Sequence, residues 1–185
     1  MSTLPDSPAA ALHEPIRSFC GSHQSIFQGL AELRRLPALA QALEDARTTA
    51  QATLALFDGD AACHNAEEEK ELFPAVLASA RGTDDEARVD ELVTRLTAEH
   101  RRIERLWAQL RPAMKAVAVG KPAGHPRFKE AVQELARAWC DHTCLEEEAF
   151  LPLADRVLAR NPNHLAALDL SLHMRHVPMP RVGYI

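Results

Sequence analysis

The chain has 185 residues, of which 46% are apolar and 25% are charged, a composition typical of one globular domain rather than of a disordered segment. Its formal net charge of −5 argues against nucleic acid as a partner, because binding phosphates needs a basic surface. No run approaches the length of a membrane span, and residues 1–11 lack the pattern of a signal peptide, so we expect neither.

The chain opens with residues 1–12, which we expect to be a loosely ordered lead-in. Apolar residues then recur at three- and four-residue spacing, the pattern of an amphipathic helix. Pro15 suits the first turn of this helix, where its missing N–H is not needed, and Pro37 predicts an end near Leu36. His23 lies on the apolar stripe of this first helix.

A second helix is predicted from about Ala38 to Phe73. The Asp-Gly-Asp run at 58–60 lies within it, but the apolar pattern resumes at once, so we expect one continuous helix. Pro74 predicts a kink, because proline removes a helical hydrogen bond, and Gly82 predicts the end of the helix or the loop beyond it.

The third helix is expected to start at residues 83–86, where a capping residue is followed by acids, and to reach about Val119. Pro112 is expected to kink it or to end its regular part. Residues 120–126 are rich in glycine and proline and predict a loop. The fourth helix is expected over 128–159.

Four long helices with short connections predict an all-α fold, an antiparallel up-down four-helix bundle over residues 13–160. No stretch alternates with a period of two, so we expect no sheet. Residues 161–185 are expected to form a C-terminal tail that packs on the bundle, with a short helix over 165–174.

One motif occurs twice, at 64–74 and at 142–152. In each copy a histidine is followed four residues later by a glutamate, then by more acid, two large apolar residues and a proline. A helix places residues four apart on one face, so each copy can present an imidazole and a carboxylate to one point. The pairs are His64 with Glu68 and His142 with Glu146.

The duplication extends beyond this motif. His23 and His100 are 77 residues apart, while the two motif histidines and the two motif glutamates are each 78 apart. We infer two helical hairpins related by an approximate twofold axis, each of which contributes two histidines and one glutamate. The predicted metal ligands are His23, His64, Glu68, His100, His142 and Glu146.

Four imidazoles and two carboxylates suit iron, with zinc or manganese less favoured. Because each carboxylate can bridge, this set predicts two iron ions with a solvent or oxo bridge and an open position, which lets a metal bind a small ligand. The chain lacks both the Glu-x-x-His of ferritin-like bundles and the His-Glu-x-x-His of zinc proteases.

These residues resemble the hemerythrin-like, or HHE cation-binding, domains over roughly 13–158. The resemblance implies that the six residues ligate an oxo-bridged di-iron centre. Oxygen-carrying hemerythrins have a second histidine on the third helix, where this chain has Glu104, so the pattern is more similar to the bacterial four-histidine, two-glutamate members. Those members include proteins that repair iron centres after nitrosative or oxidative stress, and these carry an N-terminal cysteine-bearing domain, which we do not expect in this chain.

Three functions follow as hypotheses. The first is a cytoplasmic di-iron protein that binds or senses dioxygen or nitric oxide, or handles iron in stress response and iron-centre repair, acting as a homodimer or with an iron-receiving protein. The second is an oxidoreductase acting on peroxide or nitric oxide, and the third is a structural bundle with incidental histidines. We expect binding rather than turnover, because no separate acid–base pair accompanies the ligands.

Other residues near the motifs have simpler interpretations. Glu104 is a candidate seventh ligand, but a surface acid beside Arg101 and Arg105 is favoured. The acids that flank the motif glutamates are expected to be solvated, with some orienting ligand imidazoles. Cys20, Cys63 and Cys144 are expected to be buried as small apolar residues, and all four cysteines, Cys140 included, to be reduced.

Overall fold

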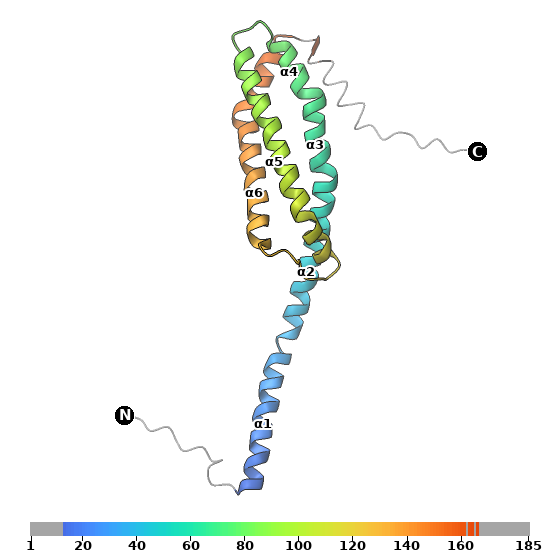
Figure 1. Cartoon of the computed structure of the whole chain (residues 1–185), viewed down its shortest axis with the longest axis vertical. Coiled ribbons are helices and arrows are strands. Elements are labelled where there is room, and N and C mark those ends of the chain that lie inside the picture. Colours follow the sequence, from blue (N-terminus) through green and yellow to red (C-terminus); the bar gives the residue numbers. More distant parts are fainter. Residues whose placement is uncertain (1–12, 162, 165, 167–185) are drawn as a thin grey trace, which may run out of the picture. The chain divides into compact units, whose positions relative to one another are not determined.

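The computed structural model describes residues 13–161, 163, 164 and 166, and these residues contain helices and no strand (Figure 1). The all-α prediction is therefore confirmed for this part of the chain. The predicted lead-in, 1–12, and most of the predicted tail, 167–185, lie outside the described residues. No helix in the described part is long and apolar enough to cross a membrane.

The chain divides into two compact units, residues 1–47 and 48–185. The first contains α1 (Glu14–Leu33) and the start of α2 (Leu36–Ala55). Pro15 lies in the first turn of α1, as predicted, but the break after α1 comes at Arg34 and Arg35, ahead of the predicted end. Pro37 is the second residue of α2, where a proline needs no hydrogen-bond partner for its nitrogen.

Helical segments succeed one another without a break through the second half of α2 and beyond it. The order is η2 (Leu56–Asp60), α3 (Ala61–Glu67), η3 (Glu68–Leu72) and α4 (Phe73–Ala80). The Asp-Gly-Asp run falls in η2, a π-helical turn, so the prediction of one continuous helix through it is confirmed. Glycine at residue 59 weakens a helix without ending it.

The rest of the second unit consists of α5 (Glu86–Ala118), α6 (Phe128–Leu145), η4 (Glu146–Phe150) and α7 (Leu151–Leu158). In Figure 1 these helices run side by side with α3 and α4, and contacts join α5 to α6 and α4 to both α5 and α7. α5 passes through Pro112 and continues to Ala118, so the prediction that its regular part might end there is wrong. One missing N–H was not enough to stop a 33-residue helix with a buried stripe along its length.

The two reversals of the second unit each contain glycine with positive φ. Gly82, between α4 and α5, has φ 74°, and Gly120 and Gly124, between α5 and α6, have φ 74° and 63°. Side chains make this left-handed conformation costly, so glycine is the residue that lets the chain turn back. Both loops were predicted from the sequence, and both predictions are confirmed.

Two apolar clusters form the core of the second unit. The first contains Val76, Leu92, Leu96, Phe150 and Val157, among others, and the second contains Ile103, Trp107, Leu110 and Leu135. Burial of each such side chain contributes roughly 1.5–3 kcal/mol. On α5, Leu96 belongs to the first cluster and Ile103 to the second, and the buried His100 lies between them. The two apolar clusters are therefore separated by buried polar residues.

Candidate metal centre

A polar layer is buried between the apolar clusters. Its members are Asn65, Glu68, His100, His142 and Glu146, each at most 6% exposed. Burying so many polar and ionisable groups costs free energy unless they are paired or bind a cation. Glu68 and Glu146 each begin a π-helical turn, η3 and η4. Such turns recur at functional sites because they change the direction of side chains along a helix.

The two oxygens of Glu68 face different histidines. Its Oε1 lies 3.3 Å from His64 Nε2, and its Oε2 lies 3.3 Å from His100 Nε2. A carboxylate that offers one oxygen to each of two imidazoles has the arrangement of a ligand that bridges two metal ions. Glu68 accordingly belongs to both groups of side chains whose donor atoms are close enough to hold a cation.

The first group consists of Glu68, His100 and His142 and is fully buried. The Nε2 atoms of the two histidines are 3.2 Å apart. Ligand atoms about 2.1 Å from one metal and at right angles to each other are about 3 Å apart. The two imidazoles therefore have the separation expected of neighbouring ligands of one ion, with Glu68 Oε2 as the third donor.

The second group consists of His64, Glu68 and Glu146, and it is more open. The His64 side chain is 52% exposed, and a cavity of about 430 Å³ lies against His64, Glu68, Glu146 and Glu147. Glu146 Oε2 points back toward the first group, 3.6 Å from His142 Nε2. Its Oε1 is buried and accepts no hydrogen bond, and the same is true of Glu68 Oε2. Buried carboxylate oxygens without donors are costly, and a bound cation would satisfy both.

Carboxylates also hold the outer nitrogens of the two buried imidazoles. His100 Nδ1 donates to Glu69 Oε1 at 2.8 Å, and Glu69 is in turn paired with Arg101. Hydrogen bonds of this kind fix the ring and the tautomer, leaving Nε2 free for a metal. Glu69, one of the acids that flank the motif glutamates, therefore holds the imidazole of a predicted ligand, His100.

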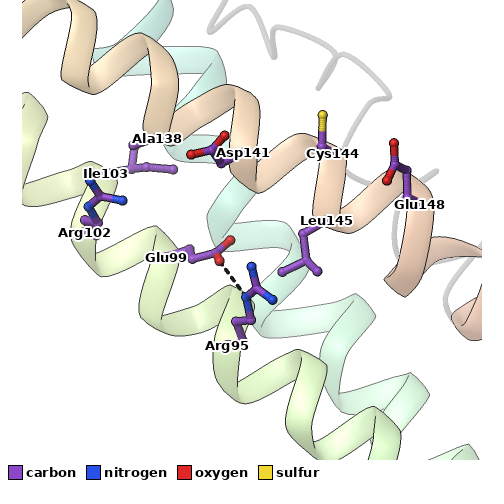
Figure 2. A pocket seen from close by; sticks show the side chains of 9 residues that line it. All are labelled: Arg95, Glu99, Arg102, Ile103, Ala138, Asp141, Cys144, Leu145 and Glu148. Atoms are coloured by element: carbon purple, nitrogen blue, oxygen red, sulfur yellow. Dashed lines mark hydrogen bonds and ion pairs between the residues drawn. The ribbon is translucent and has the colours of Figure 1, made fainter.

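His142 Nδ1 donates to Glu99 Oε2 at 3.3 Å, a contact that the sequence analysis missed. Arg95 holds Glu99 from one turn away, with a separation of 2.9 Å between Arg95 Nε and Glu99 Oε1 (Figure 2). Glu99 directly precedes His100, but nothing in the sequence pairs it with a histidine on a different helix. The contact depends on how α5 and α6 are rotated against each other.

The pKa values of the two buried carboxyls are shifted in opposite directions. Burial, then the hydrogen bond and the charge of Glu68, raise the pKa of Glu146 to about 8. Burial also acts to raise the pKa of Glu68, but its polar interactions with His100 and Glu146 outweigh burial, and the pKa is lowered. Two carboxylates buried side by side disfavour each other's charge, and a cation bound between them would stabilise both.

The pKa values of the two buried histidines are likewise shifted in opposite directions. Burial acts to lower the pKa of His100, but the hydrogen bonds to Glu68 and Glu69 outweigh it, and the pKa is raised. The pKa of His142 is lowered by burial and by the charge of His100. The carboxylates of the layer thus favour positive charge on a neighbouring group, so its donor set fits cations.

Five of the six predicted ligands thus come together, and His23 lies on α1 in the other unit, where it is exposed. Glu104 is paired with Arg101 at 2.7 Å and is 53% exposed, the geometry of the favoured surface interpretation. The expectation that Cys63 and Cys144 are buried is wrong: both are exposed, as is Cys140. Cys144 lines a pocket formed by side chains of α5, α6 and η4, together with Glu99 and Asp141 (Figure 2).

Comparison with known families gives one match, the Hemerythrin HHE cation binding domain, over residues 15–154. The match covers more than half of the chain and spans α1 as well as the buried polar layer. No curated protein and no solved structure is detectably similar to the chain.

Proposed function

Because the chain belongs to the hemerythrin HHE cation-binding family, we propose that it is a non-haem di-iron protein that binds or senses dioxygen or nitric oxide, or handles iron in stress response and iron-centre repair. The observation that carries the proposal is the Glu68 carboxylate, whose two oxygens face His64 and His100 separately. Such a carboxylate belongs between two metals rather than beside one.

The proposed ligands divide between two iron positions. His100 and His142 hold the first, with Glu68 Oε2 and Glu146 Oε2 directed toward it. His64, Glu68 Oε1 and the unpartnered Glu146 Oε1 hold the second. The second position then has only one histidine from the C-terminal unit, and we assign His23 to it as the sixth ligand. Glu104 is left out because Arg101 already neutralises it.

The same proposal makes α1 the fourth helix of an antiparallel bundle over residues 13–160. The family match begins at residue 15, so it includes α1, and His23 shares the apolar stripe of that helix. Glu147 occupies the place in the second motif copy that Glu69 has in the first, and it lines the open cavity.

Two iron ions, with a solvent or oxo bridge, would supply reversible redox chemistry and an open position for a diatomic ligand. The chain's own contribution is to bind, orient and shield. Glu69 and Glu99 fix the buried imidazoles, and Phe73, stacked on His100 with ring centroids 5.9 Å apart, covers one side. No second acid–base pair accompanies the ligands among the described residues of the layer, which supports binding over turnover.

The proposal also includes the type of hemerythrin-like domain and the cellular location of the protein. Glutamate at 104, where oxygen carriers have histidine, supports the bacterial four-histidine, two-glutamate type. Cys63, Cys140 and Cys144 are exposed and free, and exposed thiols persist in a reducing compartment, which supports a cytoplasmic location.

Metal analysis of the purified protein, with its visible spectrum in air, tests this function. We expect about two irons per chain and an oxo-to-iron absorption band. His64→Ala and Glu146→Ala should each lose metal, whereas Glu104→Ala, the matched acidic control on α5, should keep it. A folded, colourless, metal-free wild type would overturn the proposal. Steady-state consumption of peroxide or nitric oxide by the iron form would instead indicate an oxidoreductase.

A further inference from the structure

We propose that the two cation positions are unequal, and that the first, buried position binds its cation before the second and keeps it when the second is empty. The inference rests on the proposed function, which assigns two cations to this centre. It adds an order of loading, so that the chain has a stable one-cation form when the cation is scarce. Only residues of the second unit are needed to define the first position.

The donors of the first position are held in place by the protein itself. His100 and His142 are both fully buried, and their Nε2 atoms are 3.2 Å apart. Phe73 stacks on the ring of His100, and Trp139 lies beside the ring of His142, with ring centroids 5.9 and 6.0 Å apart. Little rotational freedom is therefore left for cation binding to restrict.

The outer nitrogens of both rings are held as well. His100 Nδ1 donates to Glu69 at 2.8 Å, and His142 Nδ1 donates to Glu99 at 3.3 Å. Arg95 in turn holds Glu99 (Figure 2). Carboxylates in this place orient an imidazole and make it a stronger ligand, and the loss of one typically lowers metal affinity by about 10- to 100-fold.

The second position has less support from the described residues. His64 is 52% exposed, and its Nε2 lies 3.3 Å from Glu68 Oε1. In the part of the chain that the structure describes, no carboxylate accepts a hydrogen bond from His64 Nδ1 and no aromatic ring lies beside the imidazole. A cation that binds here must first order this side chain, which costs conformational entropy.

The duplication in the sequence shows the same inequality. It repeats the candidate ligands but not the supporting pair, Arg95 and Glu99. At the offset of 77 residues that separates the histidines of the first and third predicted helices, this pair corresponds to Ser18 and Ser22. Serine carries no charge, so the first half of the duplication has no ion pair to set against the one that supports His142. The two positions therefore differ in their residues as well as in their burial.

Glu68 and Glu146 serve both positions, so the first cation also weakens the binding of the second. Once one cation has bound, the charge of the two carboxylates is partly neutralised, and the next cation meets a like charge at close range. This repulsion widens the gap between the two binding steps. The supported imidazoles decide which of the two positions is occupied first.

Substitution of each motif histidine tests the order of loading. Metal-free chain is titrated with Fe²⁺ in the absence of oxygen, native mass spectrometry counts the cations on each chain, and a competing coloured chelator gives the affinity of each step. His64→Ala should keep one Fe²⁺ at the affinity of the first wild-type step. His142→Ala should bind its one Fe²⁺ about 100-fold more weakly. Equal affinities of the two variants would overturn the order.

A milder variant guards against a folding defect. Glu99→Gln keeps the size of the side chain but removes the charge that faces His142. It should weaken the first binding step by about 10-fold and leave circular dichroism unchanged. Glu148→Gln, at an exposed acid of the same pocket, is the matched control and should leave the first step as it is in the wild type (Figure 2). An unchanged first step in Glu99→Gln would contradict the inference.

The wild-type titration separates this inference from the proposed function. At one equivalent of Fe²⁺, equal and independent positions would leave about half of the chains with one cation, whereas a 100-fold difference leaves about four fifths. A fraction of half or less would refute the order of loading and leave the di-iron function standing. A chain that takes one Fe²⁺ at saturation would refute the di-iron function and leave the first position standing, and a chain that takes none would refute both.

Discussion

At the scale of single residues, the centre depends on carboxylates that bind no metal themselves. Glu69 and Glu99 accept hydrogen bonds from the outer nitrogens of His100 and His142, and each is itself held by an arginine. This support fixes which ring nitrogen faces the layer, and it removes the rotational freedom that metal binding would otherwise have to restrict.

Glu69→Ala should therefore lower iron affinity by about 10- to 100-fold, although residue 69 is outside the proposed ligand set. Competition with a coloured chelator measures the change. Glu148→Ala is the control, because Glu148 is an exposed acid in the second motif copy. Equal affinities of the two variants would show that the contact with His100 does not support the centre.

At the scale of elements, the π-helical turns explain how helices with proline remain continuous. η3 and η4 each start at a motif glutamate, and Pro74 and Pro152 each lie in the first turn of the α-helix that follows. At Phe73 the N–H bonds to Glu68 O, five residues back, so the wider turn replaces the hydrogen bonds that proline disrupts. The irregularity predicted at Pro74 is therefore a π-helical turn that directly precedes the proline-containing α-helix.

The remaining π-helical turn, η2, is joined to α5 by the side chain of Asp58. Its Oδ1 accepts hydrogen bonds from Trp107 Nε1 at 2.9 Å and from Arg111 Nε at 2.8 Å, and its Oδ2 pairs with Arg111 Nη2 at 2.7 Å. The hydrogen bond from Arg111, then that from Trp107, hold the pKa of Asp58 below its usual value. The carboxylate is therefore favoured in the folded state.

A depressed pKa predicts stability that is present above the unfolded value, near 3.8, and lost as the pH falls through the folded value. Asp58→Asn should accordingly lower the urea midpoint at neutral pH, and the difference from wild type should vanish in strong acid. Circular dichroism during urea titration at several pH values measures it. Asp60→Asn, two residues along, is the matched control, and a difference independent of pH would contradict the assignment.

At the scale of the whole unit, two apolar clusters enclose one polar layer. Leu96 and Ile103 lie one turn to either side of His100, and each belongs to a different cluster. Because the clusters are packed against the layer from both ends, the ligands are held by the same contacts that hold the fold. Stability and metal affinity should therefore decline together when either cluster is disrupted.

Leu96→Ala should destabilise the second unit by about 2–5 kcal/mol, since the side chain is fully buried and leaves a cavity. Urea unfolding of the metal-free protein measures the change. Leu151→Ala, at a position that is 41% exposed in the adjacent α7, should cost much less. A similar loss for both variants would mean that the cluster around Leu96 is not the stabilising core.

The sequence was sufficient to predict the helices and most of their ends. Their signals are local: the spacing of apolar residues, the prolines of first turns, and the glycines of the two loops. It also supplied candidate metal ligands, because the duplication repeats a donor set at a nearly constant offset, and Glu68, His100, His142 and Glu146 of this set are buried together.

Only the tertiary structure determined how those side chains meet. The bridging orientation of Glu68, the support of His142 by Glu99, and the exposure of Cys63 and Cys144 depend on the rotation and axial position of one helix against another. Helical periodicity determines which residues lie on the same face of a helix, but it does not determine which atoms of a neighbouring helix contact that face. That choice is made by packing, and for this chain it brought residues of a repeated sequence motif into two adjoining groups of donor atoms that could each hold a cation.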